Sequence, residues 1–108
     1  MKLEVGMYVR TKDGYISQYK YYDTTNIGKL LCIPLSNGTF ANIEDIVKAS
    51  YNIIDILKEG DYVNGLYIIS IDKEEGTVIC YTSTFFEEDI MTIITHEQME
   101  QMAYKVVE

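Results

Sequence analysis

Apolar and polar residues alternate along short stretches of this chain, with the period of two that is typical of half-buried β-strands. In the first half the predicted strands cover residues 5–10, 15–22, 30–34, 39–41 and 46–50. In the second half they cover residues 61–64, 66–71, 77–83 and 90–94. Asp-Gly and Asn-Gly pairs between several segments favour tight turns, because these residues accept a positive φ. The pattern predicts a chain made mainly of short antiparallel strands.

Part of this pattern occurs twice. The frame Leu-x-x-Gly-x-Tyr-Val occupies residues 3–9 and again 57–63, and Glu-Asp-Ile at 44–46 returns at 88–90. A repeat of this kind sets the architecture, although the unequal offsets of the two echoes also allow a chance similarity. We expect two tandem units, residues 1–52 and 53–108.

The order of elements in the first half suggests a known type of small fold. Four strands, one helical turn at residues 42–45 and a last strand are how SH3-like barrels are built. The predicted fold is therefore all-β, with two tandem SH3-like barrel units and one short C-terminal helix.

That helix is predicted from its start signal. Thr95 and Gln98 have the spacing of a capping box, and Glu97 suits the positive end of a helix. Met99 and Met102 then form an apolar pair one turn apart. We expect a helix over residues 95–102, with residues 103–107 as candidates for a final strand.

Composition places the chain among globular proteins and shows an uneven charge. The 108 residues are 47% hydrophobic with a net charge of −8. Residues 1–52 hold six Lys/Arg against five Asp/Glu, whereas residues 53–108 hold three Lys against twelve Asp/Glu. No apolar run reaches the roughly 20 residues that span a bilayer, and the first residues lack the apolar stretch of a signal peptide. Cytoplasmic residence and no membrane partner are expected.

The chain has few residues that suit catalysis or metal binding. Cys32 and Cys80 lie in apolar runs and are expected to be buried. His96 is the only histidine, and a helix N-terminus disfavours its charged form. No hydrolase, metalloprotease, phosphate-loop or dinucleotide motif is present. We expect no enzyme, no metal and no cofactor.

Acidic residues of the second half form the first candidate site. Carboxylates on neighbouring loops would imitate the phosphates of a duplex and steer a basic partner. The alternative is that they only keep the protein soluble. The candidate partner-binding residues, with a phenylalanine as anchor, are Glu74, Glu75, Phe85, Phe86, Glu87, Glu88 and Asp89.

Tyrosines form the second candidate site. The chain has ten tyrosines and no tryptophan, and tyrosine is favoured at recognition surfaces. An aromatic slot beside a cation would hold a nucleotide-sized ligand; alternatively, one face of this strand fills the core. Its candidate ligand-binding residues are Arg10, Tyr15, Tyr19, Lys20 and Tyr21. The net negative charge disfavours direct binding of nucleic acid.

Four segments, residues 3–16, 44–50, 52–57 and 60–65, resemble small uncharacterised proteins encoded in phages and prophages of low-GC Gram-positive bacteria. The resemblance covers most of the chain, including residues 95–99, whereas residues 66–92 are more individual. It implies an inhibitor of host immunity, and carries over no catalytic residue. Such proteins block a nuclease complex, as anti-CRISPR proteins do, or sequester a nucleotide signal, as sponge proteins do.

Three hypotheses follow. The first is a non-enzymatic inhibitor that binds a host defence protein, such as a nucleic-acid-binding effector, through its acidic half. The second is a sponge that holds a nucleotide in the tyrosine slot, at the interface of a homo-oligomer. The third is an accessory protein of phage assembly.

Overall fold

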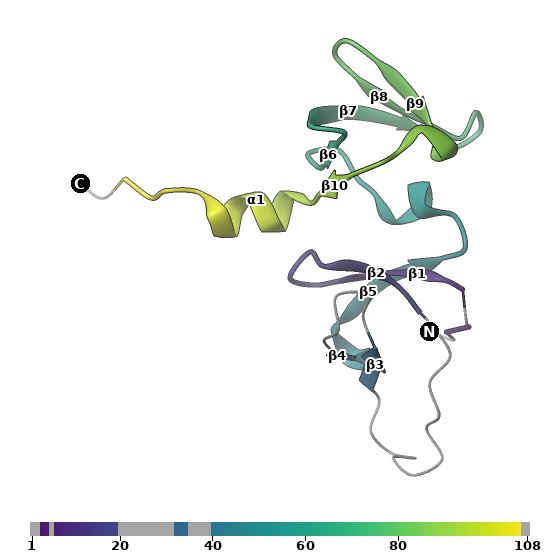
Figure 1. Ribbon diagram of the computed structural model, residues 1–108, viewed down its shortest axis with the longest axis vertical. Coiled ribbons are helices and arrows are strands. Elements are labelled where there is room, and N and C mark those ends of the chain that lie inside the picture. The colour runs from purple at the N-terminus through teal and green to yellow at the C-terminus, as the bar shows by residue number, and fades with distance from the viewer. Residues whose placement is uncertain (1–2, 5, 20–31, 35–39, 107–108) are drawn as a thin grey trace. The chain divides into compact units, whose positions relative to one another are not determined.

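The computed structural model describes residues 3–4, 6–19, 32–34 and 40–106. The chain forms two compact units, Met1–Ile56 and Leu57–Glu108. Both consist mainly of antiparallel strands (Figure 1). The predictions for Lys20 and Tyr21 lie outside the described residues.

The first unit contains a three-stranded sheet in the order β2-β1-β5. Its strands are β1 (Tyr8–Thr11), β2 (Ile16–Gln18) and β5 (Ile46–Ser50). A separate pair consists of β3 (Cys32–Pro34) and β4 (Phe40–Asn42). Two 3-10 helices flank β5, η1 (Ile43–Asp45) and η2 (Ile53–Ile56).

The core of the first unit lies against β1 and β5. Val9 is fully buried and Ile46 is nearly so, and Leu3, Tyr19 and Ala49 pack against them. β1 does not alternate in burial, because Val9, Arg10 and Thr11 are all buried.

The second unit contains a five-stranded sheet in the order β10-β6-β7-β8-β9. Its strands are β6 (Tyr62–Val63), β7 (Leu66–Asp72), β8 (Thr77–Cys80), β9 (Thr84–Phe86) and β10 (Ile93–Ile94). The 3-10 helix η3 (Glu87–Asp89) joins β9 to the β10 segment, and α1 (His96–Met102) follows β10. One face of this sheet carries the buried side chains of Val63, Ile68, Val78 and Cys80. We call the opposite face the outer face.

The repeated sequence frame forms the same turn in both units. Gly6 and Gly60 each have a φ of +97°, a conformation that side chains with a Cβ rarely adopt. The amide after each glycine donates to the carbonyl three residues earlier, at 3.1 Å in both copies. Each glycine amide donates across the sheet, to the carbonyl of Tyr19 at 2.8 Å and of Ile68 at 3.1 Å. The frame therefore encodes one backbone geometry twice.

The order of elements also recurs. In each unit a 3-10 helix with the Glu-Asp echo precedes the last strand: η1 lies directly before β5, and residues 90–92 separate η3 from β10. In sequence, residues 19–31 separate β2 from β3, whereas residues 73–76 separate β7 from β8. This difference accounts for most of the unequal offset between the two sequence echoes.

The structure confirms a mainly β fold with one short C-terminal helix. The predicted capping box is present: Thr95 accepts from the Gln98 amide at 3.3 Å, and Gln98 accepts from the Thr95 amide at 3.0 Å. Across the described residues, neither sheet closes into a barrel. None of the helices in this part of the chain is long and apolar enough to cross a membrane.

Three predictions for the second half were wrong. The strand expected over residues 77–83 ends at Cys80, where a turn bonds the Cys80 amide to the Ser83 carbonyl at 2.8 Å. Residues 84–86 then form β9, which the predicted strands of the second half did not include. Residues 103–106 form no strand.

Candidate functional site

The antiparallel register of β8 and β9 brings two acidic loops to one end of the second sheet. Thr77 begins β8 directly after the β7–β8 turn, and it lies opposite Phe86, the last residue of β9. The turn and η3 therefore lie at the same end (Figure 1). We call this group the acidic end; it consists of Asp72, Glu74, Glu75, Phe86, Glu87, Glu88 and Asp89.

The β7–β8 turn is held by a carboxylate of the acidic end itself. Oδ1 of Asp72 accepts from the amides of Glu74 and Glu75, each at 3.1 Å. This is the local bond by which aspartate stabilises turns. The side chains of Glu74 and Glu75 remain exposed.

The η3 loop is fixed by a second aspartate and by Asn64. Oδ2 of Asp89 accepts from the Phe86 amide at 3.3 Å. Asn64 donates from Nδ2 to the Asp89 carbonyl at 2.9 Å, and its Oδ1 accepts from the amides of Met91 at 2.8 Å and Thr92 at 3.1 Å. One side chain thus positions the whole segment that follows β9.

Sequence reasoning identified Asn64 only as part of a turn. Its φ is +52°, in the left-handed region where asparagine is enriched among residues other than glycine. An Asn-Gly pair indicates such a conformation, but nothing in the sequence indicates which distant amides the Asn64 side chain binds.

The charge of the acidic end is largely uncompensated. In the part of the chain that the structure describes, the lysine ion pairs of the second unit are Lys58–Glu97 at 2.6 Å and Lys105–Glu100 at 3.3 Å. Neither involves the acidic end, where Lys73 is the one cation within the β7–β8 turn. Six carboxylates at this end of the sheet create a negative potential there.

The two candidate anchors face opposite sides of the sheet. Phe85 lies opposite buried Val78 and is half-buried, whereas Phe86 lies on the outer face with 48% of its surface exposed. Phe86 is therefore the exposed aromatic side chain of the acidic end.

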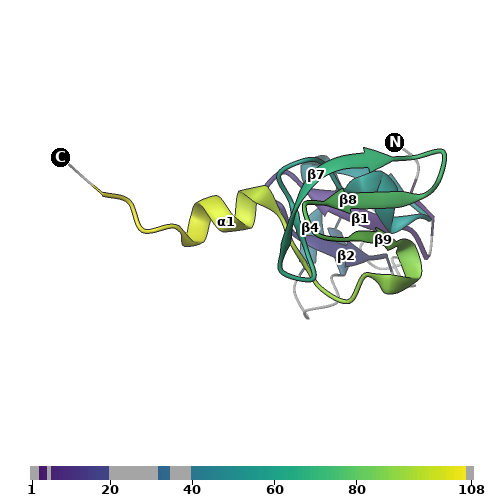
Figure 2. The ribbon, with the colours of Figure 1, turned by 90° about the horizontal axis from the view of Figure 1, so that it is seen from above.

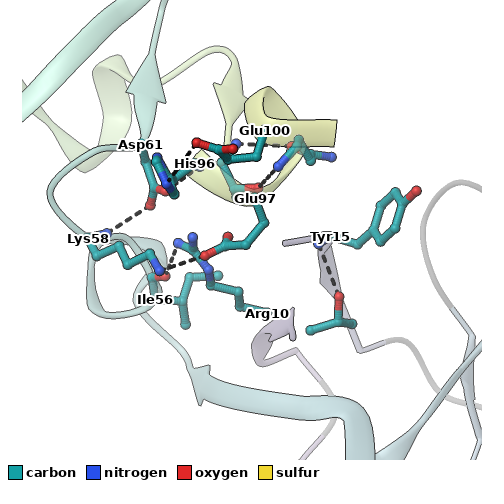
Figure 3. Close-up of polar contacts among 11 residues, drawn as sticks. Arg10, Tyr15, Ile56, Lys58, Asp61, His96, Glu97 and Glu100 are labelled. Atoms are coloured by element: carbon teal, nitrogen blue, oxygen red, sulfur yellow. Dashed lines mark hydrogen bonds and ion pairs between the residues drawn. The ribbon is translucent and has the colours of Figure 1, made fainter. Parts of the chain in front are cut away.

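The tyrosine slot is less favoured by the structure. Arg10 is 2% exposed, and its Nη1 donates to the Ile56 carbonyl at 3.0 Å (Figure 3). Tyr19 packs against the core of the first unit. Tyr15 is 42% exposed and points away from Arg10 (Figure 3). Of the described slot residues, only Tyr15 presents an exposed ring.

A buried carboxylate that sequence reasoning missed anchors the C-terminal helix. Asp61 is fully buried, its Oδ2 accepts from the Lys58 amide and its Oδ1 accepts from the His96 amide, each at 2.9 Å (Figure 3). It thus joins the repeated turn to the first residue of α1. The first copy of the repeat has Met7 at this position. This difference between the two copies was the sequence feature that could have pointed to Asp61.

The described residues offer little for metal or thiol chemistry. No three of their His, Cys, Asp or Glu side chains lie together in a way that suits a metal ion. Cys80 is a free, buried thiol, and burial raises its pKa above the ordinary value of 9.0.

Comparison with protein-family models, with curated proteins and with solved structures finds no match to this chain.

Proposed function

We propose that this chain is a non-enzymatic, phage-encoded binding protein that inhibits a host defence component in the host cytoplasm. Contact is made through the acidic end of the second unit. Each unit follows an SH3-like plan, as the recurring order of strands with a 3-10 helix before the last one suggests. One observation carries the proposal: the β8–β9 register brings two acidic loops and an exposed phenylalanine together.

The arrangement suits a basic protein surface. Opposite charge speeds diffusional encounter and fixes orientation, and an aromatic residue at the centre of a contact supplies much of the binding free energy. Phe86 lies beside η3 and opposite the start of β8, so a partner would bury its ring between the two charged loops. A nucleic-acid-binding effector has a surface of the required charge.

The rival sponge hypothesis needs an open cationic slot. Burial of Arg10 and its bond to the Ile56 carbonyl favour a structural role for this guanidinium instead. The inhibitor is therefore the preferred hypothesis.

Affinity purification from infected host cells tests the proposal. Tagged wild-type protein is compared with the double variant Glu74→Gln/Glu88→Gln and with Phe86→Ser. The matched control is Glu44→Gln/Glu59→Gln, which removes two exposed carboxylates outside the acidic end. Asp72 and Asp89 are left intact because they hold their loops.

We expect a host protein that binds the wild type and the control. The charge variant should bind it about tenfold more weakly at low salt, with the difference shrinking as ionic strength rises. Native mass spectrometry before and after heat denaturation tests whether the protein holds a nucleotide instead. A nucleotide released on denaturation, with no host protein retained, would replace the inhibitor with the sponge. Co-purification with virions would favour the assembly hypothesis.

A further inference from the structure

Residues 103–106 follow α1 as an exposed stretch of chain in the second unit. Tyr104 is 89% exposed and Val106 is 80% exposed. Ala103, the C-cap residue of α1, has an extended backbone with φ −69° and ψ 135°. Figures 1 and 2 show α1 and these residues leading away from the sheet of the second unit. A large aromatic side chain is therefore accessible directly after the helix.

The main chain of this segment is not engaged by the fold. Residues 104–106 lie outside any helix or strand, and their backbone groups form no hydrogen bond with another described residue. Lys105 pairs with Glu100 at 3.3 Å, but the two side chains are 68% and 57% exposed. Exposed ion pairs contribute little to stability. The segment is therefore free to be bound along its backbone without any part of the fold opening first.

An endoprotease requires this combination. Recognition of an extended peptide uses hydrogen bonds to its main chain and a pocket for one side chain, and the S1 pocket of some serine proteases is a hydrophobic slot. We propose that the Tyr104–Lys105 peptide bond is a cleavage site for an endoprotease whose S1 pocket accepts an aromatic side chain. Hydrolysis adds water across this bond, so Tyr104 gains a carboxylate and the Lys105 nitrogen leaves as an amine. No other co-reactant is needed.

Exposure alone does not make such a site, as Tyr81 shows. Its side chain is 82% exposed, which is close to the value for Tyr104. Tyr81 lies in the turn between β8 and β9, where the Cys80 amide donates to the Ser83 carbonyl at 2.8 Å. The strands on both sides of that turn are paired with each other. A protease can bind Tyr81 in an extended backbone only after this hairpin opens, whereas Tyr104 needs no opening.

The contacts that anchor α1 precede the proposed cleavage site. Thr95 is fully buried and caps the helix, and the His96 amide donates to Asp61 at 2.9 Å. Cleavage therefore leaves α1 in place and removes the exposed side chain of Val106. The acidic end, which lies within residues 72–89, is unchanged. The inference thus goes beyond the proposed function and does not depend on it.

Limited proteolysis of the full chain with chymotrypsin, followed by mass spectrometry, tests the proposal. We expect a product that ends at Tyr104. It should form at least about 100-fold faster than any product cut after Tyr81, because cleavage there must wait for the β8–β9 turn to open. The truncated protein should melt at the same temperature as the full chain.

Two variants at one position make the test specific. Lys105→Pro keeps the tyrosine but gives the scissile bond a ring nitrogen that carries no hydrogen, so the product that ends at Tyr104 should disappear. The matched control is Lys105→Met, which also loses the ion pair to Glu100 but keeps the amide hydrogen, and it should be cleaved at least as fast as the wild type.

Each of four results would overturn the proposal. They are a wild type that yields no product ending at Tyr104, equal rates of cleavage after Tyr81 and Tyr104, a Lys105→Pro variant that is still cut after Tyr104, and a Lys105→Met control that resists cleavage. Because Lys105 is exposed, both variants should keep the melting temperature of the wild type, so a difference in cleavage reports on the bond itself.

Discussion

Replacing Asp61 with asparagine tests how the C-terminal helix is anchored. Asp61 is fully buried, and each carboxylate oxygen accepts one backbone amide at 2.9 Å, from Lys58 and from His96. In the Asp61→Asn variant one oxygen becomes an NH₂ group, which faces an amide that also donates. The variant therefore loses one hydrogen bond and leaves a donor without an acceptor, while its volume is unchanged.

The magnitude follows from these contacts. A hydrogen bond to a charged group contributes about 1.5–3 kcal/mol, and an unsatisfied buried donor costs about 1–3 kcal/mol. The two figures describe the same broken contact and are not added, so we expect Asp61→Asn to lower the free energy of unfolding by about 2–3 kcal/mol. For a domain of this size that corresponds to a fall in Tm of roughly 10–20 °C.

Urea unfolding followed by tyrosine fluorescence measures the loss, and hydrogen exchange locates it at the amides of Lys58 and His96. The matched control is Glu59→Gln, which neutralises an exposed carboxylate two residues away and should change stability by less than about 0.5 kcal/mol. If Asp61→Asn unfolds like this control, the carboxylate does not anchor the helix and the reasoning fails.

Three further predictions concern other side chains described above. Arg10→Met should lower the free energy of unfolding by about 1–3 kcal/mol in urea titration, because the Ile56 carbonyl loses its 3.0 Å donor; an unchanged midpoint would refute this. Asn64→Gly keeps the positive φ but removes the side-chain acceptor of the Met91 amide, so hydrogen exchange at that amide should accelerate at least about tenfold, and unaltered protection would contradict the role. Burial raises the pKa of Cys80 and keeps its thiol protonated, so native protein should resist alkylation at pH 8. The contribution of the buried, protonated thiol to the free energy of unfolding is complete below about pH 9.0 and is lost as pH rises through the folded-state pKa. Rapid labelling of Cys80 in folded protein would show the burial argument to be wrong.

Local signals predicted much of the fold. Alternation identified most strands, and the capping box of Thr95 and Gln98 placed the start of α1 correctly. The repeated frame indicated two similar units, but the strand predicted over residues 5–10 included Gly6, and the positive φ shared by Gly6 and Gly60 was not predicted. The strands and the start of α1 depend on residues that are neighbours in sequence, so they can be predicted from the sequence alone.

Other features depend on distant contacts. β9 was missed because Phe85 and Phe86 are adjacent apolar residues, and pairing with β8 overrides the absence of alternation. Burial of Arg10 and Asp61 was missed because charged residues are almost never fully buried unless they are paired. Their partners, the Ile56 carbonyl and the His96 amide, lie far along the chain.

The sequence predicted which residues form the candidate site, but only part of their arrangement in space. The sequence indicated neighbouring acidic loops, but the register that places Phe86 opposite Thr77 is a property of the folded sheet. The choice between Phe85 and Phe86 as the exposed ring also follows from that register.

The bond from Asp89 to the Phe86 amide has a consequence for aggregation. β9 is the outermost strand of its sheet, and such a strand presents unpaired amides that recruit strands from other molecules. Its sequence, Thr-Phe-Phe, is of the type that forms intermolecular sheets. The Phe86 amide donates to Asp89, so it is already hydrogen-bonded. The chain then leaves the edge of the sheet through three consecutive acidic residues. The loop that we propose for recognition is thus also a gatekeeper, which keeps an exposed phenylalanine from templating a fibril.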